Sequence, residues 1–224
     1  MSTSESSPPA HAALAGAPRD RLPPALWLAA GVAIGASVWL GIVTTQPAEP
    51  DVMGMVNRWL VRAGLPFFCL AFAASSLARL WPSPFTRRLL RERRGLGLAF
   101  AMIHLTHAAA VMSTWPGAAE NVPPAFVIAF GGTGFALTAA MAATSSDAAQ
   151  RALGRGWGRL HRTGIWYLMF LYAYTYLGRV LEDAAPWPVF ALALMLGLVG
   201  LRFGVWWRRR RSAGGAGSVA AARS

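Results

Sequence analysis

Six long apolar stretches constrain the fold of this chain more than any other feature. A helix that crosses a bilayer needs about 20 largely apolar residues, because its backbone must satisfy its own hydrogen bonds across roughly 30 Å of hydrocarbon. Stretches of this kind occupy residues 25–45, 59–81, 96–115, 124–144, 163–181 and 189–207. We therefore predict an all-α fold in which residues 25–207 form a six-transmembrane-helix bundle.

The composition agrees with a membrane protein and argues against nucleic acid as a partner. Only 13% of the residues are charged, whereas soluble domains carry roughly a quarter. The net charge of +12 comes from arginine, since the chain contains no lysine. A nucleic-acid-binding surface interleaves basic and aromatic side chains where water reaches them, but here the arginines cluster between apolar stretches. The predicted partner is the lipid bilayer.

The positions of the charges predict how the helices are oriented. Arginines cluster after the second, fourth and sixth stretches, the last cluster being the run at residues 208–211. The other connections carry acidic residues, namely Glu49, Asp51, Glu120, Glu182 and Asp183. Because cytoplasmic loops hold the positive excess, we expect both termini in the cytoplasm. The tails, residues 1–24 and 208–224, are expected to be disordered because their composition cannot bury enough apolar surface.

Two histidines lie deep in the third stretch, where an ionisable side chain is costly and therefore indicates function. His104 and His107 are spaced i, i+3 on one face, and His104 lies about 15 Å along the helix from Arg94. His161 stands at the inner edge of the fifth stretch. His104 and His161 thus differ in depth by roughly 15 Å and cannot bind the same metal ion. The alternative for His107 is a hydrogen bond to a neighbouring helix, and for His161 a plain interfacial histidine.

Two tyrosines of the fifth stretch are level with His104. Counted from Arg162, Tyr172 and Tyr174 lie about 15 to 18 Å into the membrane. The pKa of a phenol is about 10 and rises further in an apolar bundle, so these tyrosines are expected to be neutral. We therefore expect a phenol hydroxyl to form a hydrogen bond with His104.

Two segments resemble a known membrane family. The sequences "SSLARLWPSPFTRRLLRERRGLGLAFAMIHLTH" and "TAAMAATSSDAAQRALGRGWGRLHR" are similar to the ferric reductase-like transmembrane domain, and within it to the MsrQ type of haem-binding subunit. The resemblance covers roughly residues 59–207. It implies a six-helix protein of the bacterial inner membrane that binds haem b and passes electrons across the bilayer. The family's implied acceptor is a periplasmic molybdenum-containing reductase.

The family pattern assigns roles to particular histidines. His104 matches the outer haem ligand on the third helix, and His161 matches the histidine that opens the fifth. The third family histidine, 13 residues after the second, falls on Tyr174. Two alternatives follow: either His104 still holds a haem, with Tyr174, Tyr172 or another group opposite, or the chain is a haem-free scaffold or assembly protein. His107 remains a further candidate for contact with the cofactor.

The source of electrons must lie outside this chain. The segment after residue 207 is too short to fold as a flavin or nicotinamide domain, so we expect a separate flavoprotein or quinol as donor. The chain is then at most an electron-transfer subunit of an oxidoreductase, with no catalytic residues of its own. A small-solute transporter is a weaker alternative, since the sequence shows neither a mid-membrane acidic residue nor a broken helix pair.

Overall fold

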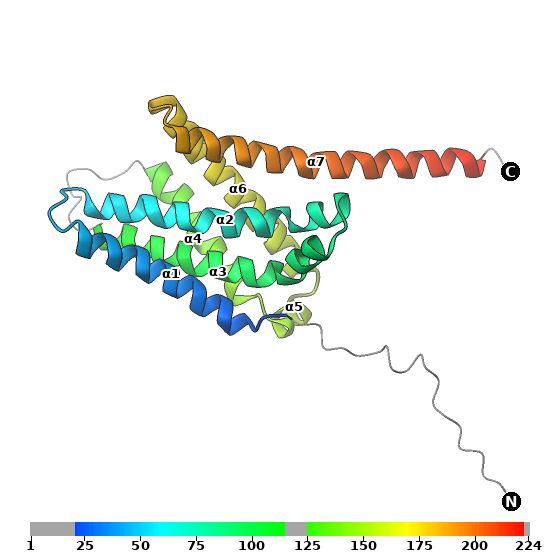
Figure 1. Cartoon of the computed structure of the whole chain (residues 1–224). Coiled ribbons are helices and arrows are strands. Elements are labelled where there is room, and N and C mark those ends of the chain that lie inside the picture. The colour runs from blue at the N-terminus through cyan, green and yellow to red at the C-terminus, as the bar shows by residue number, and fades with distance from the viewer. Residues whose placement is uncertain (1–20, 115–124, 222–224) are drawn as a thin grey trace, which may run out of the picture.

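The predicted all-α fold is confirmed by the computed structural model, which describes residues 21–114 and 125–221 (Figure 1). This part of the chain forms seven helices and no strand. They are α1 (Pro24–Thr45), α2 (Val52–Leu80), α3 (Pro84–Thr114), α4 (Ala125–Ala143), α5 (Asp147–Leu153), α6 (Arg155–Glu182) and α7 (Pro186–Ala221). Residues 1–20 of the tail that was expected to be disordered lie outside the described residues. The same holds for Glu120, which was expected to face outward.

The predicted number of six membrane-crossing helices is not confirmed by length and hydropathy in the described part of the chain. Four helices in the described chain are long and apolar enough on their own: α1, α2, α3 and the Pro186–Arg211 part of α7. A fifth candidate is α4 taken together with α5, a pair that bends by 106°. The predicted stretch 163–181 lies in α6, which has 28 residues, but its tyrosines, tryptophan and arginine lower its hydropathy. The chain is therefore a multi-pass helical membrane protein.

Several helices extend beyond the apolar stretches that predicted them. α2 begins at Val52, where the Asp51 side chain accepts a hydrogen bond of 3.1 Å from the Gly54 amide. α3 begins at Pro84, well before residue 96, because arginine and leucine are good helix formers that continue the helix into the interface. α7 likewise continues past residue 207 through the arginine run.

The turn between α4 and α6 contains a short helix that the sequence did not predict. Ser146 caps α5 by accepting a hydrogen bond of 3.0 Å from the Ala149 amide. Gly154 then separates α5 from α6 with a φ of 49°, a left-handed conformation that glycine adopts without steric cost. Together these two residues reverse the chain at the end of the bundle and set the direction of α6.

The helices pack around a central pair, α2 and α3. These two helices lie side by side, α1 packs against both, α7 packs against α2 and α6, and α4 packs against α3 and α6 (Figure 1). Small residues allow the closest approach, since a methyl group added at Gly31 would lie 2.6 Å from the Ala99 carbonyl oxygen. The main core joins aromatic and aliphatic side chains of α2, α3, α6 and α7. This core supports the helices that carry the histidines.

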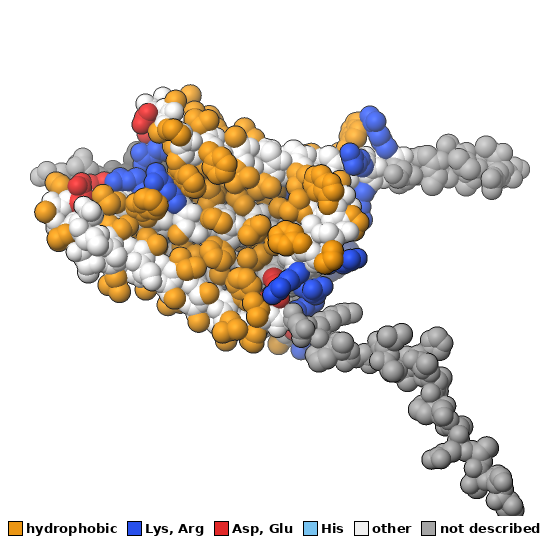
Figure 2. All heavy atoms as spheres, in the orientation of Figure 1, with side chains coloured by type: hydrophobic (Ala, Val, Ile, Leu, Met, Phe, Trp, Pro, Cys, Tyr) orange, Lys and Arg blue, Asp and Glu red, His pale blue; other side chains and the backbone are white. Residues whose placement is uncertain are grey.

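The two ends of the bundle differ in charge. The start of α1, the α2–α3 turn, α5 and the end of α7 lie at one end, which we call the inner end (Figure 1). Arginine side chains gather over it in Figure 2, and a broad apolar band follows. At the opposite end, arginines are paired with carboxylates, as in Arg58 with Asp51 at 2.9 Å and Arg179 with Glu182 at 3.7 Å. Arginine side chains are thus concentrated at the inner end of the described bundle.

Candidate functional site

His104 lies in the middle of the bundle, enclosed by aromatic rings. Its side chain is 6% exposed. Phe100 stacks on it at a centroid distance of 5.1 Å, and Phe135 of α4 and Tyr172 of α6 lie at 4.9 and 6.0 Å. Neither Nδ1 nor Nε2 has a hydrogen-bond partner within the described chain. Because buried polar atoms are nearly always bonded, this imidazole is available to a partner that the chain does not supply.

The structure brings only one of the two candidate tyrosines to His104. Tyr172 is buried, stacks on Phe68 at 5.5 Å, and its hydroxyl has no partner among the described residues, so the expected hydrogen bond to His104 is not formed. Tyr174 is 51% exposed and packs against Phe130 at 5.6 Å, on another face of α6. Side chains two positions apart on a helix point in directions that differ by about 200°. Tyr172 and Tyr174 can therefore have similar depths and still lie on different faces of α6.

His107 interacts with a neighbouring helix. Its Nδ1 lies 3.0 Å from the Asn57 side-chain oxygen, so α2 and α3 are joined by this hydrogen bond. The ring is 5.7 Å from that of His104. For His107 the sequence analysis gave two possibilities, contact with the cofactor or a hydrogen bond to a neighbouring helix, and this contact is the second.

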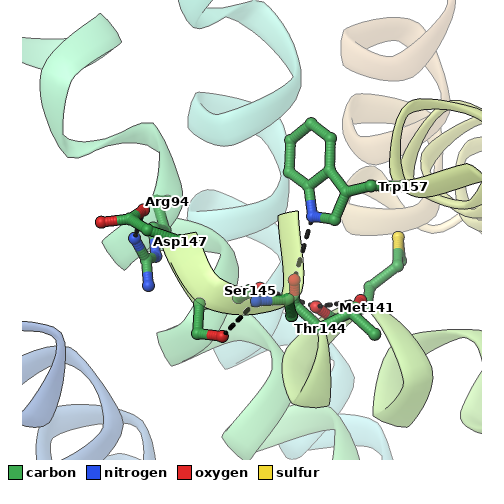
Figure 3. A network of polar contacts seen from close by, with 8 residues as sticks. Arg94, Met141, Thr144, Ser145, Asp147 and Trp157 are labelled. Carbon is green, nitrogen blue, oxygen red and sulfur yellow. Dashed lines mark hydrogen bonds and ion pairs between the residues drawn. The ribbon is translucent and has the colours of Figure 1, made fainter. Parts of the chain in front are cut away.

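His161 lies near the inner end, at the break between α4 and α5. Its Nε2 is 3.2 Å from the Thr144 hydroxyl, and its ring stacks on Trp157 at a centroid distance of 4.3 Å. Trp157 in turn donates a hydrogen bond of 2.9 Å to the Thr144 carbonyl (Figure 3). The end of α4 therefore holds both rings of α6 in place.

A cavity of about 600 Å³ opens beside His161. Its apolar wall includes Phe68, Phe100, Ile165 and Leu168, and its polar wall includes guanidinium groups from three helices. The three helices contribute Arg91, Arg93 and Arg94 (α3), Arg162 (α6) and Arg202 (α7). Arg21, just before α1, adds a sixth guanidinium group. The cavity thus combines one imidazole, an apolar surface and a strong positive potential.

Arg94 of this cavity forms an ion pair, and the positive charge of Arg93 acts on His161. Arg94 pairs with Asp147 of α5 at 2.7 Å (Figure 3). Burial, and then the positive charge of Arg93, lower the pKa of His161, which precedes the predicted span 163–181. The lowered pKa favours the neutral imidazole, the form that can bind a metal.

The two candidate histidines occupy separate levels, as the sequence predicts. The step from His161 to Tyr172 along α6 is eleven residues, or about 16 Å, and Tyr172 contacts the ring of His104. Phe100 lies between the levels, because it lines the cavity and stacks on His104. Among the described residues, no group of three His, Cys, Asp or Glu side chains is arranged to hold a metal ion.

Sequence reasoning missed three parts of the site. Arg202 lies within the apolar stretch 189–207, and a charge inside such a stretch was the available signal. Trp157 precedes His161 by four residues, a spacing that places both on one helix face. The pairing of Arg94 with Asp147 gave no signal, since it depends on the unpredicted helix α5.

Known proteins similar to this chain agree on one family. No protein-family profile and no solved structure matches it. The protein-methionine-sulfoxide reductase heme-binding subunit MsrQ of Klebsiella pneumoniae is 30% identical over 189 residues, which cover 78% of this chain and 89% of that protein. The proteins of the same name from an Enterobacter species and Salmonella paratyphi B are 30% and 32% identical, over 76% and 70% of this chain and 88% and 81% of their own lengths. The chain therefore belongs to the MsrQ family.

Proposed function

We propose that this protein is a haem-binding membrane subunit that passes electrons across the bilayer to a partner reductase. The observation that carries this proposal is the cavity of about 600 Å³ at the inner end, where His161 meets apolar walls and arginines. The relatives named as heme-binding subunits support the same assignment.

The residues of the cavity fit a b-type haem. His161 offers an imidazole, a side chain that holds haem iron in many proteins, and its Nε2, now 3.2 Å from the Thr144 hydroxyl, would be the atom that binds. Phe68 and Leu168 offer an apolar surface to the porphyrin plane, and Arg91 and Arg162 can pair with the propionate carboxylates. Bound haem would supply a one-electron iron couple.

His104 provides a second ligand position deeper in the membrane. Leaving a buried polar group without a partner costs about 1 to 3 kcal/mol, and a bond to one ring nitrogen would remove that cost. The lining of the inner cavity reaches Phe100 but does not include His104, whose surroundings are filled by aromatic rings. A haem at this level would therefore require Phe135 or Tyr172 to move.

The orientation of the chain follows from its arginine-rich end. We propose that α1, α2, α3, α4, α6 and α7 cross the bacterial inner membrane, with the inner end and both termini in the cytoplasm. Electrons would enter from a separate flavoprotein or from quinol and leave to a periplasmic molybdenum-containing reductase. Supporting evidence is the charge asymmetry of the bundle and the reductase system in the relatives' names.

The test is the visible spectrum and haem content of the purified full-length protein. We expect a Soret band and a reduced b-type spectrum, with haem content falling severalfold in His161→Ala. His107→Gln is the matched control, because glutamine can still bond to Asn57, and it should keep its haem. Wild-type protein that is colourless and cannot be reconstituted with haem would refute the proposal and support the haem-free scaffold instead. His104→Ala reports separately on the deeper position.

A further inference from the structure

A second cavity of about 490 Å³ lies at the inner end between α2, α3, α6 and α7. Five guanidinium groups line it, contributed by Arg79, Arg93, Arg162, Arg202 and Arg209. The hydroxyl groups of Ser75 and Ser76 lie in the same wall. The cavity therefore has the donors for an anion with several oxygen atoms.

The positive charge of this cavity is not neutralised by the described protein. Its lining includes no carboxylate, and the ion pairs of the described chain use other arginines: Arg58, Arg94 and Arg179. Arg202 stacks over Phe72 at 4.2 Å, and its buried Nη1 has no hydrogen-bond partner in the described part. Guanidinium groups gathered in this way repel one another, so the cavity favours an anionic ligand.

The outer rim of the cavity is apolar and faces away from the bundle. Phe203 and Trp206 of α7 line the cavity and are still 57% and 45% exposed. These rings lie just before the arginine run of α7, residues 208–211. A ligand that fits both parts has a compact anionic head and an apolar chain.

We propose that this cavity binds the phosphodiester headgroup of an anionic phospholipid, with an acyl chain lying along Phe203 and Trp206. Basic pockets between transmembrane helices on the cytoplasmic side are suited to such headgroups, and arginine binds phosphate through paired N–H donors. A free phosphate would use the same guanidinium groups but would leave the apolar rim without a partner.

Arg79 and Arg209 allow this cavity to be tested separately from the cavity beside His161. Both line the second cavity and are absent from the lining of the first, whereas Arg93, Arg162 and Arg202 line both. The lipid proposal therefore does not depend on haem binding, and the double variant Arg79→Gln/Arg209→Gln leaves every arginine of the first cavity in place.

The experiment measures lipid binding by the full chain in detergent, by native mass spectrometry. The probes are phosphatidylglycerol, phosphatidylcholine and inorganic phosphate. Wild-type protein should retain phosphatidylglycerol in preference to phosphatidylcholine, and R79Q/R209Q should bind it about 10- to 30-fold more weakly, since a hydrogen bond from each of these guanidinium groups to the headgroup contributes roughly a factor of five. R87Q/R88Q is the matched control, because it removes the same charge from exposed residues outside both cavities and should bind normally.

The outcomes separate three explanations. Equal loss in R79Q/R209Q and R87Q/R88Q would mean diffuse attraction to the whole basic surface and would overturn the site. Displacement of the lipid by inorganic phosphate at similar concentration would assign the cavity to a soluble anion and overturn the lipid. R79K/R209K keeps the charge but not the paired N–H donors, so its binding should lie between that of the wild type and that of R79Q/R209Q. If the thermal unfolding midpoint of R79Q/R209Q fell together with its lipid binding, the loss would be a folding defect and the proposal would fail.

Discussion

The seam between α1 and α3 can be tested by adding a single methyl group. A Cβ at Gly31 would lie 2.6 Å from the carbonyl oxygen of Ala99, 2.8 Å from the Cβ of Met102 and 2.9 Å from the Cα of Ala99. Two of these atoms belong to the backbone of α3 and cannot rotate away. We therefore expect Gly31→Ala to force α1 away from α3.

The size of the displacement follows from the distances. Ordinary contact begins at 3.4 Å, so the helices must separate by 3.4 − 2.6 = 0.8 Å at this point. The separation would also lengthen the hydrogen bonds from the Leu22 amide and the Trp27 indole to the buried Glu92 carboxylate, now 3.2 and 3.1 Å. Overpacking of a close seam costs about 1 to 3 kcal/mol.

The assay is thermal unfolding of the purified protein in one detergent, with Gly41→Ala as the control. A Cβ at Gly41 meets no atom within 4 Å, and alanine has a higher helix propensity by up to about 1 kcal/mol. Gly41→Ala should therefore match or exceed the wild-type midpoint, while Gly31→Ala should fall by about 2 to 4 °C for each kcal/mol lost. Equal midpoints for the two variants would refute the close packing of α1 on α3.

Three further substitutions test individual contacts of the site. Asn57→Ala leaves the His107 ring without its partner and should cost about 1 to 3 kcal/mol in chemical unfolding; wild-type stability would show that the 3.0 Å contact contributes nothing. Trp157→Phe removes the 2.9 Å hydrogen bond to the Thr144 carbonyl and should cost about 1 kcal/mol by the same measurement, and a gain in stability would contradict this role. Tyr174→Phe should leave both stability and the visible spectrum unchanged, since the side chain is 51% exposed; a spectral shift would place Tyr174 at the cofactor.

Much of the fold could be predicted from hydrophobicity, because a bilayer allows few backbone structures. The all-helical class followed from the apolar stretches alone. The break between α4 and α5 could not be predicted in this way, since it depends on the Ser146 cap and the left-handed conformation of Gly154. The tyrosines of α6 carry polar atoms that lower its hydropathy: Tyr167 donates a hydrogen bond to the Phe130 carbonyl, whereas the hydroxyls of Tyr172 and Tyr176 have no partner among the described residues.

The site was predicted in depth but not in direction. Counting residues along a helix placed Tyr172 at the level of His104, whose ring it contacts, yet the rotation of α6, which turns Tyr174 towards Phe130, is set by tertiary packing. The cavity beside His161 could not be predicted from the sequence either. Its arginines come from helices distant in the chain, and the sequence assigned them only a topological role.

Arginine is suited to both roles at once, which explains how one set of charges can orient the bundle and line its cavities. A guanidinium group can lie flat on an aromatic ring and still donate hydrogen bonds from its edge, which an ammonium group does less well. Arg202 lies over Phe72 and Trp166, at 4.2 and 5.4 Å, and its buried Nη1 has no hydrogen-bond partner in the described part of the chain. Because Arg93, Arg162 and Arg202 line both inner cavities, an anion in one cavity neutralises charge that the other also uses. Occupants of the two cavities should therefore weaken each other's binding, an interaction that added salt would screen.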